Sequence, residues 1–294
     1  MKDPFYIGIS GSCAALVTPF HADGSLDEAM LRRLVCDCVD GGLNFLCVLG
    51  TTAETPTLTP DEQLRVREIV VEATACRRPL LLGYGSNSTQ DVIRRMQHDT
   101  FEGIDALLIV TPYYNKPSQE GLYRHFRAIA EASPLPIVLY NVPGRTGVNM
   151  TAETTLRIAR DCHNVIGVKE ASGNLEQIGR IIAERPVGFK VLCGDDKLTC
   201  KVMEMGGDGV ISVVANLYPA ETASMVEAMR QGDTAQAAAL EARLAPFCDM
   251  LFAEGSPSGI KAALSLQGRC ENVVRLPLTT VSESLMQAMD EHMK

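Results

Sequence analysis

The sequence lacks three features that mark membrane, secreted and nucleic-acid-binding proteins. No stretch approaches the run of about twenty apolar residues that spans a bilayer. Met1 to Ser12 lack the charged start, apolar centre and small-residue cleavage site of a signal peptide. The formal net charge of -9 argues against a nucleic-acid surface, although positive groups gathered locally would still allow an anionic substrate. We therefore expect a cytoplasmic protein whose partners include neither nucleic acid nor membrane.

The sequence also lacks the closely spaced cysteines and histidines that are typical of metal sites and of disulfide-rich proteins. The ten cysteines include no CxxC pair, and the five histidines are dispersed along the chain. Cys36 and Cys38 lie two residues apart on an expected helix, and therefore on different faces. This pattern predicts free thiols in a reducing compartment, with no metal site and no other cofactor.

Eight short apolar runs indicate buried strands. They cover residues 13–17, 45–49, 79–82, 106–110, 137–140, 165–169, 191–193 and 210–214. Most are continuously apolar, which is typical of parallel strands that helices cover on both faces.

Helix-start signals separate these runs. The candidates are a capping box at Ser25–Glu28, a cap with a following proline at Thr59–Glu62, and single starts at Thr151, Asp196 and Pro219. Strand and helix therefore alternate eight times. This order predicts an α/β protein of the (β/α)8 TIM-barrel class.

A doubly wound open sheet is the alternative fold. It usually has fewer strands and a glycine-rich phosphate turn after the first one, whereas Gly8–Ser12 precedes the first run. After Leu217 the pattern changes to helical, alanine-rich segments. Because no linker rich in Ser, Pro or Gly intervenes, we predict a catalytic barrel over 1–225. A C-terminal helical region over 226–294 is expected to pack on it.

Lys169 is the most unusual residue of the eight runs, within the segment V-I-G-V-K-E-A-S that begins at Val165. Burying an ammonium is costly unless the group is paired or loses its proton. One interpretation is a strand-end lysine paired with a carboxylate. The other is a desolvated amine that attacks a carbonyl, because burial can lower a lysine pKa by roughly 3 to 5 units. Glu170 points the other way along the pleat and is expected to be structural.

Further reactive side chains follow the strands at their carboxyl ends, where the chemistry of a barrel sits. Each alone has an ordinary structural explanation. Together with Lys169 they indicate Schiff-base chemistry on a small carbonyl compound that carries a carboxylate. A tyrosine relayed through a threonine hydroxyl can move the protons. The turn at Gly50, with Thr51 and Thr52, can hold one carboxylate, and Arg145 can pair with a second.

Five motifs carry a resemblance to a known family. They are GTTAET at 50–55, TPYYNKPSQEGLYRHF at 111–126, YNVPGRT at 140–146, GVKEASG at 167–173 and GDGVISVVAN at 207–216. The chain closely resembles the dihydrodipicolinate synthase and N-acetylneuraminate lyase family of pyruvate-dependent class I aldolases. The similarity extends from Gly11 to about Gly268.

The resemblance implies catalytic roles for four residues. Lys169 would form an imine with pyruvate, and Tyr140 would be the central acid and base. Thr52 would link Tyr140 to Tyr114, which in the family reaches into the active site of the neighbouring subunit. A tight dimer, usually paired into a homotetramer, is therefore implied.

Substrate binding is implied for a second group of residues. Thr51 and Thr52 would bind the pyruvate carboxylate, and Gly194 and Ile211 would line the pocket. Arg145 is similar to the synthase branch, in which an arginine binds the carboxylate of L-aspartate-4-semialdehyde. The implied reaction condenses this aldehyde with pyruvate to 4-hydroxy-tetrahydrodipicolinate, toward diaminopimelate and lysine.

Two other functions are considered. The first is a related aldolase for a sugar keto acid such as N-acetylneuraminate or 2-keto-3-deoxygluconate, in which Arg145 would matter little. The second is a catalytically silent barrel that binds a small carboxylate as a sensor or scaffold. Retention of Lys169, Tyr140, Tyr114 and Thr52 together argues against the silent barrel.

The chain departs from the family pattern in two places. Ala53 stands where the family has glycine, which would strain the loop if that position needs a positive φ. The other departure concerns feedback by lysine. The possible inhibitor site comprises Asn87, Asp91, Tyr113, Thr55 and Pro56. Asp91 is shorter than the usual acid, and the histidines often found near Pro60 and Gln63 are missing, which favours weak or absent inhibition.

Overall fold

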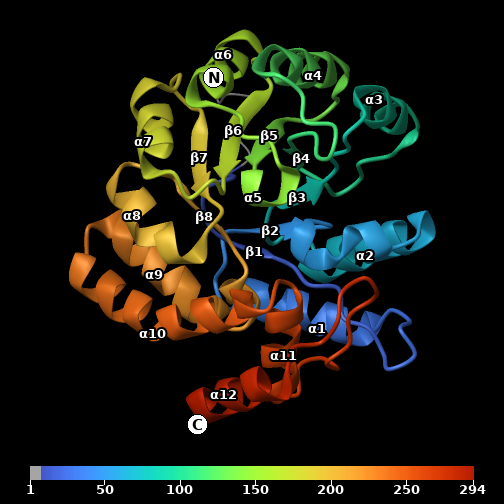
Figure 1. Ribbon diagram of the computed structural model, residues 1–294, viewed down its shortest axis with the longest axis vertical. Coiled ribbons are helices and arrows are strands. Elements are labelled where there is room, and N and C mark those ends of the chain that lie inside the picture. The colour runs from blue at the N-terminus through green and yellow to red at the C-terminus, as the bar shows by residue number, and fades with distance from the viewer. Residues whose placement is uncertain (1–7) are drawn as a thin grey trace. The chain divides into compact units, whose positions relative to one another are not determined.

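The computed structural model describes residues 8–294, so the predicted absence of a signal peptide over Met1 to Ser12 falls partly outside the described residues. Eight strands are neighbours in sequence order in a closed barrel (Figure 1). They are β1 Gly11–Ala15, β2 Phe45–Val48, β3 Leu80–Gly83, β4 Ala106–Val110, β5 Ile137–Asn141, β6 Val165–Glu170, β7 Lys190–Cys193 and β8 Gly209–Ser212. The predicted (β/α)8 barrel with added C-terminal helices is confirmed, and the open sheet is wrong.

Helices follow the strands along the chain. The α-helices are α1 Glu28–Asp40, α2 Pro60–Thr74, α3 Thr89–His98, α4 Gln119–Ala132, α5 Pro143–Thr146, α6 Ala152–Asp161, α7 Leu175–Glu184, α8 Thr199–Glu204, α9 Pro219–Gln231, α10 Thr234–Ala253, α11 Ser258–Leu266 and α12 Glu283–Met293. Short 3-10 turns are η1 Thr51–Ala53, η2 Thr55–Thr57, η3 Asp196–Leu198 and η4 Val214–Asn216.

Two predicted helix starts differ from the structure, at Asp196 and at Ser25. Asp195 and not Asp196 caps the 3-10 turn η3, and α8 begins only at Thr199. Thr59 and Glu62 form the predicted capping box of α2, and Thr151 caps α6. The predicted start of α1 at Ser25 is wrong, because Asp27 is the N-cap and accepts a hydrogen bond from the Met30 N–H. The Ser25 hydroxyl instead donates to Asp23 at 2.6 Å, a local turn that competes with capping.

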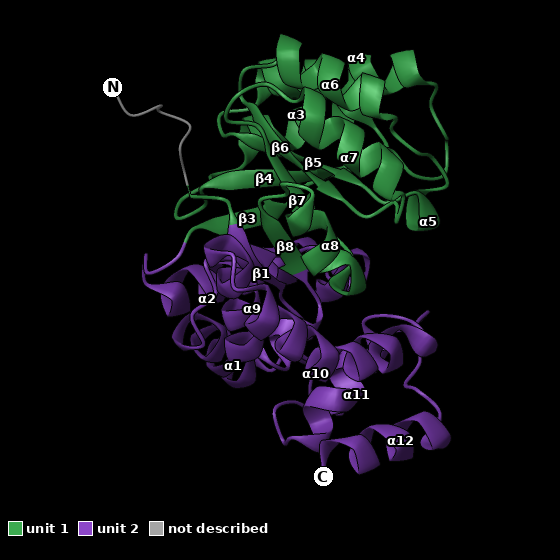
Figure 2. Ribbon diagram, turned by 90° about the vertical axis from the view of Figure 1, so that its left-hand side faces the viewer, with its two compact units in different colours: residues 1–10, 79–211 green, residues 11–78, 212–294 purple. Residues whose placement is uncertain are grey.

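The chain divides into two compact units, shown in separate colours in Figure 2. Unit 1 contains the described residues 8–10 and residues 79–211, and unit 2 contains residues 11–78 and 212–294. The predicted boundary between a barrel at 1–225 and a helical region at 226–294 stays a prediction.

Unit 1 contains the run of paired strands from β3 to β7, and β7 also pairs with β8. Its outer helices surround these strands in Figure 1, and α3 contacts α4, α4 contacts α6, and α6 contacts α7. Central strand residues such as Leu107, Val138 and Val191 are completely buried. Burial on both faces explains why the strands appear in the sequence as continuous apolar runs.

A shift in strand register within unit 1 sets the direction of its central lysine. The pairing of β5 with β6 shifts by one residue between Ile137 and Val138. Because side chains alternate along a strand, an extra residue reverses the faces that follow it. Lys169 therefore lies opposite Tyr140, a place that Val168 would take without the shift.

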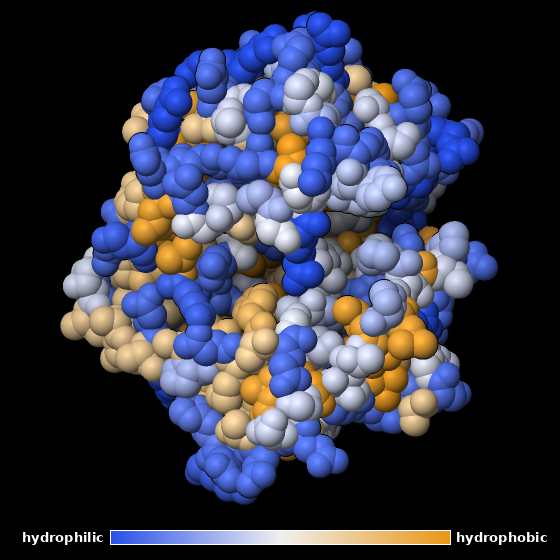
Figure 3. Space-filling view, in the orientation of Figure 1, coloured by the Kyte–Doolittle hydropathy of each residue, from blue (hydrophilic) through white to orange (hydrophobic). Residues whose placement is uncertain are grey.

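Unit 2 pairs β1 with β2 and packs them with helices from both ends of the chain. Helix α9 contacts β1 and α1, and α1 contacts α2. Helices α10, α11 and α12 contact one another and form the C-terminal part of the unit. Exposed alanines at 235, 238, 239 and 242 give α10 a mildly apolar outer surface, tan at the lower left of Figure 3. No helix within residues 8–294 is long and apolar enough to cross a membrane.

Candidate active site

Lys169 and Tyr140 lie side by side at the carboxyl ends of β6 and β5. They are register partners in the parallel sheet, and each is only 6% exposed. The Lys169 Nζ lies 4.3 Å from the centre of the Tyr140 ring. The structure thus brings together the predicted nucleophile and the predicted acid and base.

No ion pair of Lys169 is present among the described residues, which contradicts the interpretation of a structurally paired lysine. Cys193, the other nucleophile type nearby, stays a thiol because burial raises its pKa to about 12. Lys169 is therefore the candidate nucleophile of unit 1.

Gly194 supplies the space that the Lys169 side chain occupies. A Cβ at Gly194 would lie 3.0 Å from the Lys169 Cε and 2.7 Å from the Ala171 Cβ. The Gly194 N–H also donates to the Glu170 carbonyl at 2.8 Å, which holds the two strand ends together. A larger residue at position 194 would therefore collide with the Lys169 side chain, and the pocket-lining role of Gly194 stays a prediction.

Glu170 faces away from Lys169 into a cage of neutral donors. Its carboxylate accepts hydrogen bonds from Asn141 at 3.1 Å, from Gln177 at 3.0 Å and from the Ser172 N–H at 2.9 Å. Burial raises the pKa of the Glu170 carboxyl, and these hydrogen bonds oppose the rise. The cage ties the ends of β5 and β6 to α7, in agreement with the structural role expected for Glu170.

Arg145 is exposed and lies on the one-turn helix α5, which directly follows β5. Buried Thr146 fixes this turn, since its hydroxyl is within hydrogen-bond distance of the Val142 and Val148 carbonyls at 3.2 and 3.0 Å. The following segment is held as well, because the Asn141 side chain accepts from the Met150 N–H at 2.9 Å. A rigid support therefore carries an arginine that reaches solvent.

Tyr113 and Tyr114 lie in the loop after β4 and not on the strand. Tyr114 is 89% exposed and has a left-handed backbone with φ of 72°. A non-glycine residue adopts this conformation at a cost. The structure of one chain thus does not place the Tyr114 side chain beside Tyr140.

In unit 2, the predicted carboxylate-binding threonines form the 3-10 turn η1. Thr51 is exposed and Thr52 is 5% exposed. The Thr55 hydroxyl donates to the Gly50 carbonyl at 3.0 Å, and the Thr18 hydroxyl donates to the Ala53 carbonyl at 2.8 Å. These hydrogen bonds stabilise the turn, and the backbone N–H groups and hydroxyls of Thr51 and Thr52 are its candidate donors to a carboxylate.

Ala53 is compatible with this turn. It lies inside η1 and is not among the residues with positive φ, whereas the next residue, Glu54, has φ of 55°. The strain that glycine would relieve is therefore absent at Ala53 itself.

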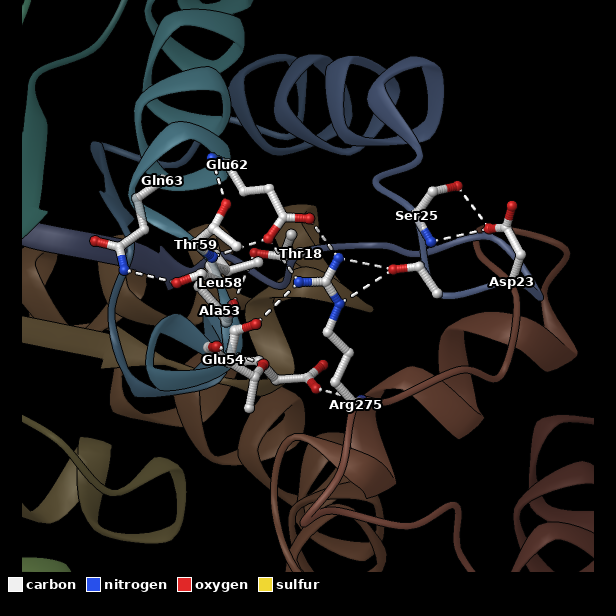
Figure 4. A network of polar contacts seen from close by, with 12 residues as sticks. Thr18, Asp23, Ser25, Ala53, Glu54, Leu58, Thr59, Glu62, Gln63 and Arg275 are labelled. Carbon is white, nitrogen blue, oxygen red and sulfur yellow. Dashed lines mark hydrogen bonds and ion pairs between the residues drawn. The ribbon is translucent and has the colours of Figure 1, made fainter.

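The charged network beneath the turn was not predicted. Glu54 and Lys261 form an ion pair in which both side chains are completely buried, 207 residues apart in the chain. Arg275 binds the same carboxylate and also Glu62 (Figure 4). The signal was visible in the sequence, because Lys261 interrupts the apolar run S-G-I-K-A-A-L much as Lys169 interrupts its strand.

The possible lysine-inhibitor residues are divided between the two units. Asn87, Asp91 and Tyr113 belong to unit 1, whereas Thr55 and Pro56 belong to unit 2. The Asp91 carboxylate is paired with Arg94 at 2.8 Å and with Arg95 at 3.2 Å on its own helix. The hydrogen bond from Arg94 is the main reason that the pKa of Asp91 is lowered.

Comparison with known proteins identifies the family. The model of the dihydrodipicolinate synthetase family matches residues 8–294. The chain belongs to this family. A 4-hydroxy-tetrahydrodipicolinate synthase from Parabacteroides distasonis is 51% identical over 272 residues, which cover 92% of each chain. The synthase of the same name from Phocaeicola vulgatus is 48% identical over 281 residues, covering 96% of this chain and 95% of that protein.

Solved structures of the dihydrodipicolinate synthetase family share the fold. The chloride-inhibited dihydrodipicolinate synthase from Acinetobacter baumannii, complexed with pyruvate, superposes with a TM-score of 0.93 at 38% identity. The match covers 97% of this chain and 98% of that one. The predicted family resemblance is therefore confirmed, and these relatives carry the name of the synthase and not of a sugar-acid lyase.

Proposed function

We propose that this chain condenses pyruvate with L-aspartate-4-semialdehyde to give 4-hydroxy-tetrahydrodipicolinate. The chain is a lyase-type synthase of the class I aldolase family. The single observation that carries the mechanism is the buried Lys169 amine beside Tyr140, without an ion-pairing carboxylate in the described part of the chain. A desolvated amine in this setting is the nucleophile that imine formation needs.

The proposed reaction balances with protein groups alone. The Lys169 amine attacks the C2 carbonyl of pyruvate, and loss of water gives the imine. Loss of a C3 proton gives an enamine, which adds to the aldehyde carbon and forms the new C–C bond, while the aldehyde oxygen takes up a proton. The amino group of the semialdehyde then displaces Lys169 from the imine and closes the ring. Tyr140, with Thr52 and Tyr114, would carry these protons.

Substrate recognition is proposed for the two carboxylates separately. Thr51 and Thr52 would bind the pyruvate carboxylate through hydroxyl and amide donors of the turn, whose form Thr18 and Glu54 stabilise. Gly194 and Ile211 would line the pyruvate site. The exposed Arg145 guanidinium on its rigid turn would pair bidentately with the carboxylate of the semialdehyde.

The identity of the aldehyde acceptor is the first part of the proposal to test. In a coupled assay, purified protein with pyruvate should turn over L-aspartate-4-semialdehyde, because the Arg145 guanidinium can form two hydrogen bonds with its carboxylate. N-acetylneuraminate and 2-keto-3-deoxygluconate should release no pyruvate under the same conditions. Turnover of a sugar acid without activity on the semialdehyde would move this chain to the lyase function.

An oligomer is proposed from the exposure of Tyr114. Tyr114 is 89% exposed on a left-handed backbone, so the described residues of its own chain cover little of its side chain. We expect it to enter the proton relay of a neighbouring subunit in a tight dimer, and two such dimers to form a homotetramer. The ten free cysteines support the proposed cytoplasmic location, since thiols persist in a reducing compartment.

Weak feedback by lysine is proposed from the ion pairs of Asp91. A lysine ammonium would have to compete with Arg94 and Arg95 for this short carboxylate. We expect less than about twofold loss of activity at about 1 mM L-lysine, which corresponds to roughly -4 kcal/mol of binding free energy or weaker. Arg94→Gln removes one competitor and should strengthen inhibition. Inhibition of the wild-type protein at micromolar L-lysine would contradict this proposal.

A further inference from the structure

Glu54 is the most constrained residue of the Gly50–Thr55 turn. It is 2% exposed and has a left-handed backbone with φ of 55°. It ends η1, where its N–H donates to the Thr51 carbonyl at 3.2 Å, and it directly precedes η2. Since residues other than glycine adopt this backbone at a cost, side-chain contacts must hold Glu54 in place.

Both carboxylate oxygens of Glu54 are bound by groups from the C-terminal region. Lys261 of α11 pairs with Oε1, and the backbone N–H of Arg275 donates to Oε2 at 2.9 Å. The Lys261 side chain is inaccessible to solvent, and its Nζ also donates to the Val273 carbonyl at 2.9 Å and lies 3.9 Å from the centre of the Phe20 ring. The carboxylate is therefore fixed at two points.

The Arg275 side chain extends this network to the second 3-10 turn, as Figure 4 shows. Its guanidinium donates to the two Glu62 oxygens at 2.5 and 2.7 Å and to the Thr57 carbonyl at 2.9 Å. The hydrogen bond from Arg275 is the main reason that the pKa of Glu62 falls to about 2, so this pair stays charged at neutral pH. Groups from the C-terminal region thus hold both η1 and η2.

Stability alone does not account for such a pair. The desolvation of two buried charges offsets their attraction, and apolar replacements of buried ion pairs are often neutral or stabilising. The ion pair instead fixes the position of the turn. Because its carboxylate is bound at both oxygens, Glu54 is held in place, and the short 3-10 turn passes this constraint to Thr51 and Thr52.

We propose that Lys261 and Glu54 are positioning residues that hold Thr51 and Thr52 in the geometry that binds the pyruvate carboxylate. This inference rests on the proposed function, in which these threonines bind that carboxylate. The C-terminal region thereby acts on the turn after β2 without contacting substrate. A displaced turn weakens pyruvate binding, slows the proton transfers that run through Thr52, and leaves the acceptor site intact.

Two variants test the inference. Lys261→Met keeps most of the side-chain volume but leaves Glu54 without its partner. Lys261→Met combined with Glu54→Gln removes both charges, and so tests the same point if the single variant folds poorly. In the folded variants we expect the KM for pyruvate to rise about 10- to 100-fold. The KM for the semialdehyde, and the borohydride-trapped adduct at saturating pyruvate, should stay within about twofold.

A matched control is Lys190→Met, which breaks the ion pair of Lys190 with the part-buried Asp208 at 3.0 Å in unit 1. It should lower the Tm without changing the KM for pyruvate. An unchanged pyruvate KM in either folded variant of Lys261 overturns the inference. Wild-type protein is trapped first: no adduct on Lys169 contradicts the proposed function, whereas normal trapping with unchanged KM contradicts only the positioning role.

Discussion

Replacing Lys169 by methionine is expected to lower kcat by at least about 10³-fold, because removal of a covalent nucleophile leaves only binding and polar stabilisation. Incubation of the wild-type protein with pyruvate and borohydride should add reduced pyruvate to the peptide that contains Lys169. Lys169→Met should give no such adduct. Mass spectrometry of the digested protein measures both outcomes.

The environment of Lys169 explains why this effect should be large. The amine is 6% exposed, lies 4.3 Å from the centre of the Tyr140 ring and forms no ion pair within the described chain. Lys190→Met, at the other end of the neighbouring strand, is the control and should retain both activity and labelling. Labelling of a different lysine in the wild-type protein would contradict the assignment of Lys169.

Replacing Arg145 by alanine is expected to lower kcat/KM for L-aspartate-4-semialdehyde by about 10²- to 10³-fold. A guanidinium binds a carboxylate through two parallel hydrogen bonds, and loss of such a charged pair is worth several kcal/mol. The kcat/KM of Arg145→Lys should lie between the values of the wild-type protein and of Arg145→Ala, because an ammonium keeps the positive charge but cannot form two parallel hydrogen bonds with the carboxylate. Steady-state kinetics with each substrate varied in turn measure the effect.

The specificity of the Arg145 effect distinguishes acceptor binding from general damage. Pyruvate trapping on Lys169 should be unchanged in Arg145→Ala, since Arg145 lies on α5 and its turn is fixed by other residues. Arg180→Ala removes an exposed arginine whose one ion pair within residues 8–294 is with Glu184 at 3.0 Å, and it should leave the kinetics with both substrates unchanged. Equal loss of trapping and turnover in Arg145→Ala would argue against a role in acceptor binding.

Local sequence was sufficient to predict the elements of the barrel because periodicity and capping are local properties. The apolar runs matched strands to within about two residues at their ends, and Thr59 and Thr151 capped the helices as predicted. The predicted helix start at Ser25 was wrong because two carboxylates compete at this point: Asp23 accepts from the Ser25 hydroxyl, and Asp27 caps the helix. Competition between neighbouring hydrogen bonds is decided by geometry that the sequence does not display.

Pairs across the sheet depended on tertiary structure. The one-residue shift in register between β5 and β6 places Lys169 on the same face as Tyr140, and no signal in either run announces it. The exposure of Tyr114 likewise follows from the loop after β4, which ends the strand at Val110.

The two buried lysines separate what the sequence determined from what the fold determined. Lys169 and Lys261 each interrupt an apolar segment, a costly place for an ammonium, although only Lys169 was singled out from the sequence. Only the fold decided which of the two lysines has a carboxylate partner. Lys261 meets Glu54 across 207 residues, whereas no carboxylate within the described chain pairs with Lys169. The partner of a buried charge is a long-range contact, and such contacts exist only after the chain has folded.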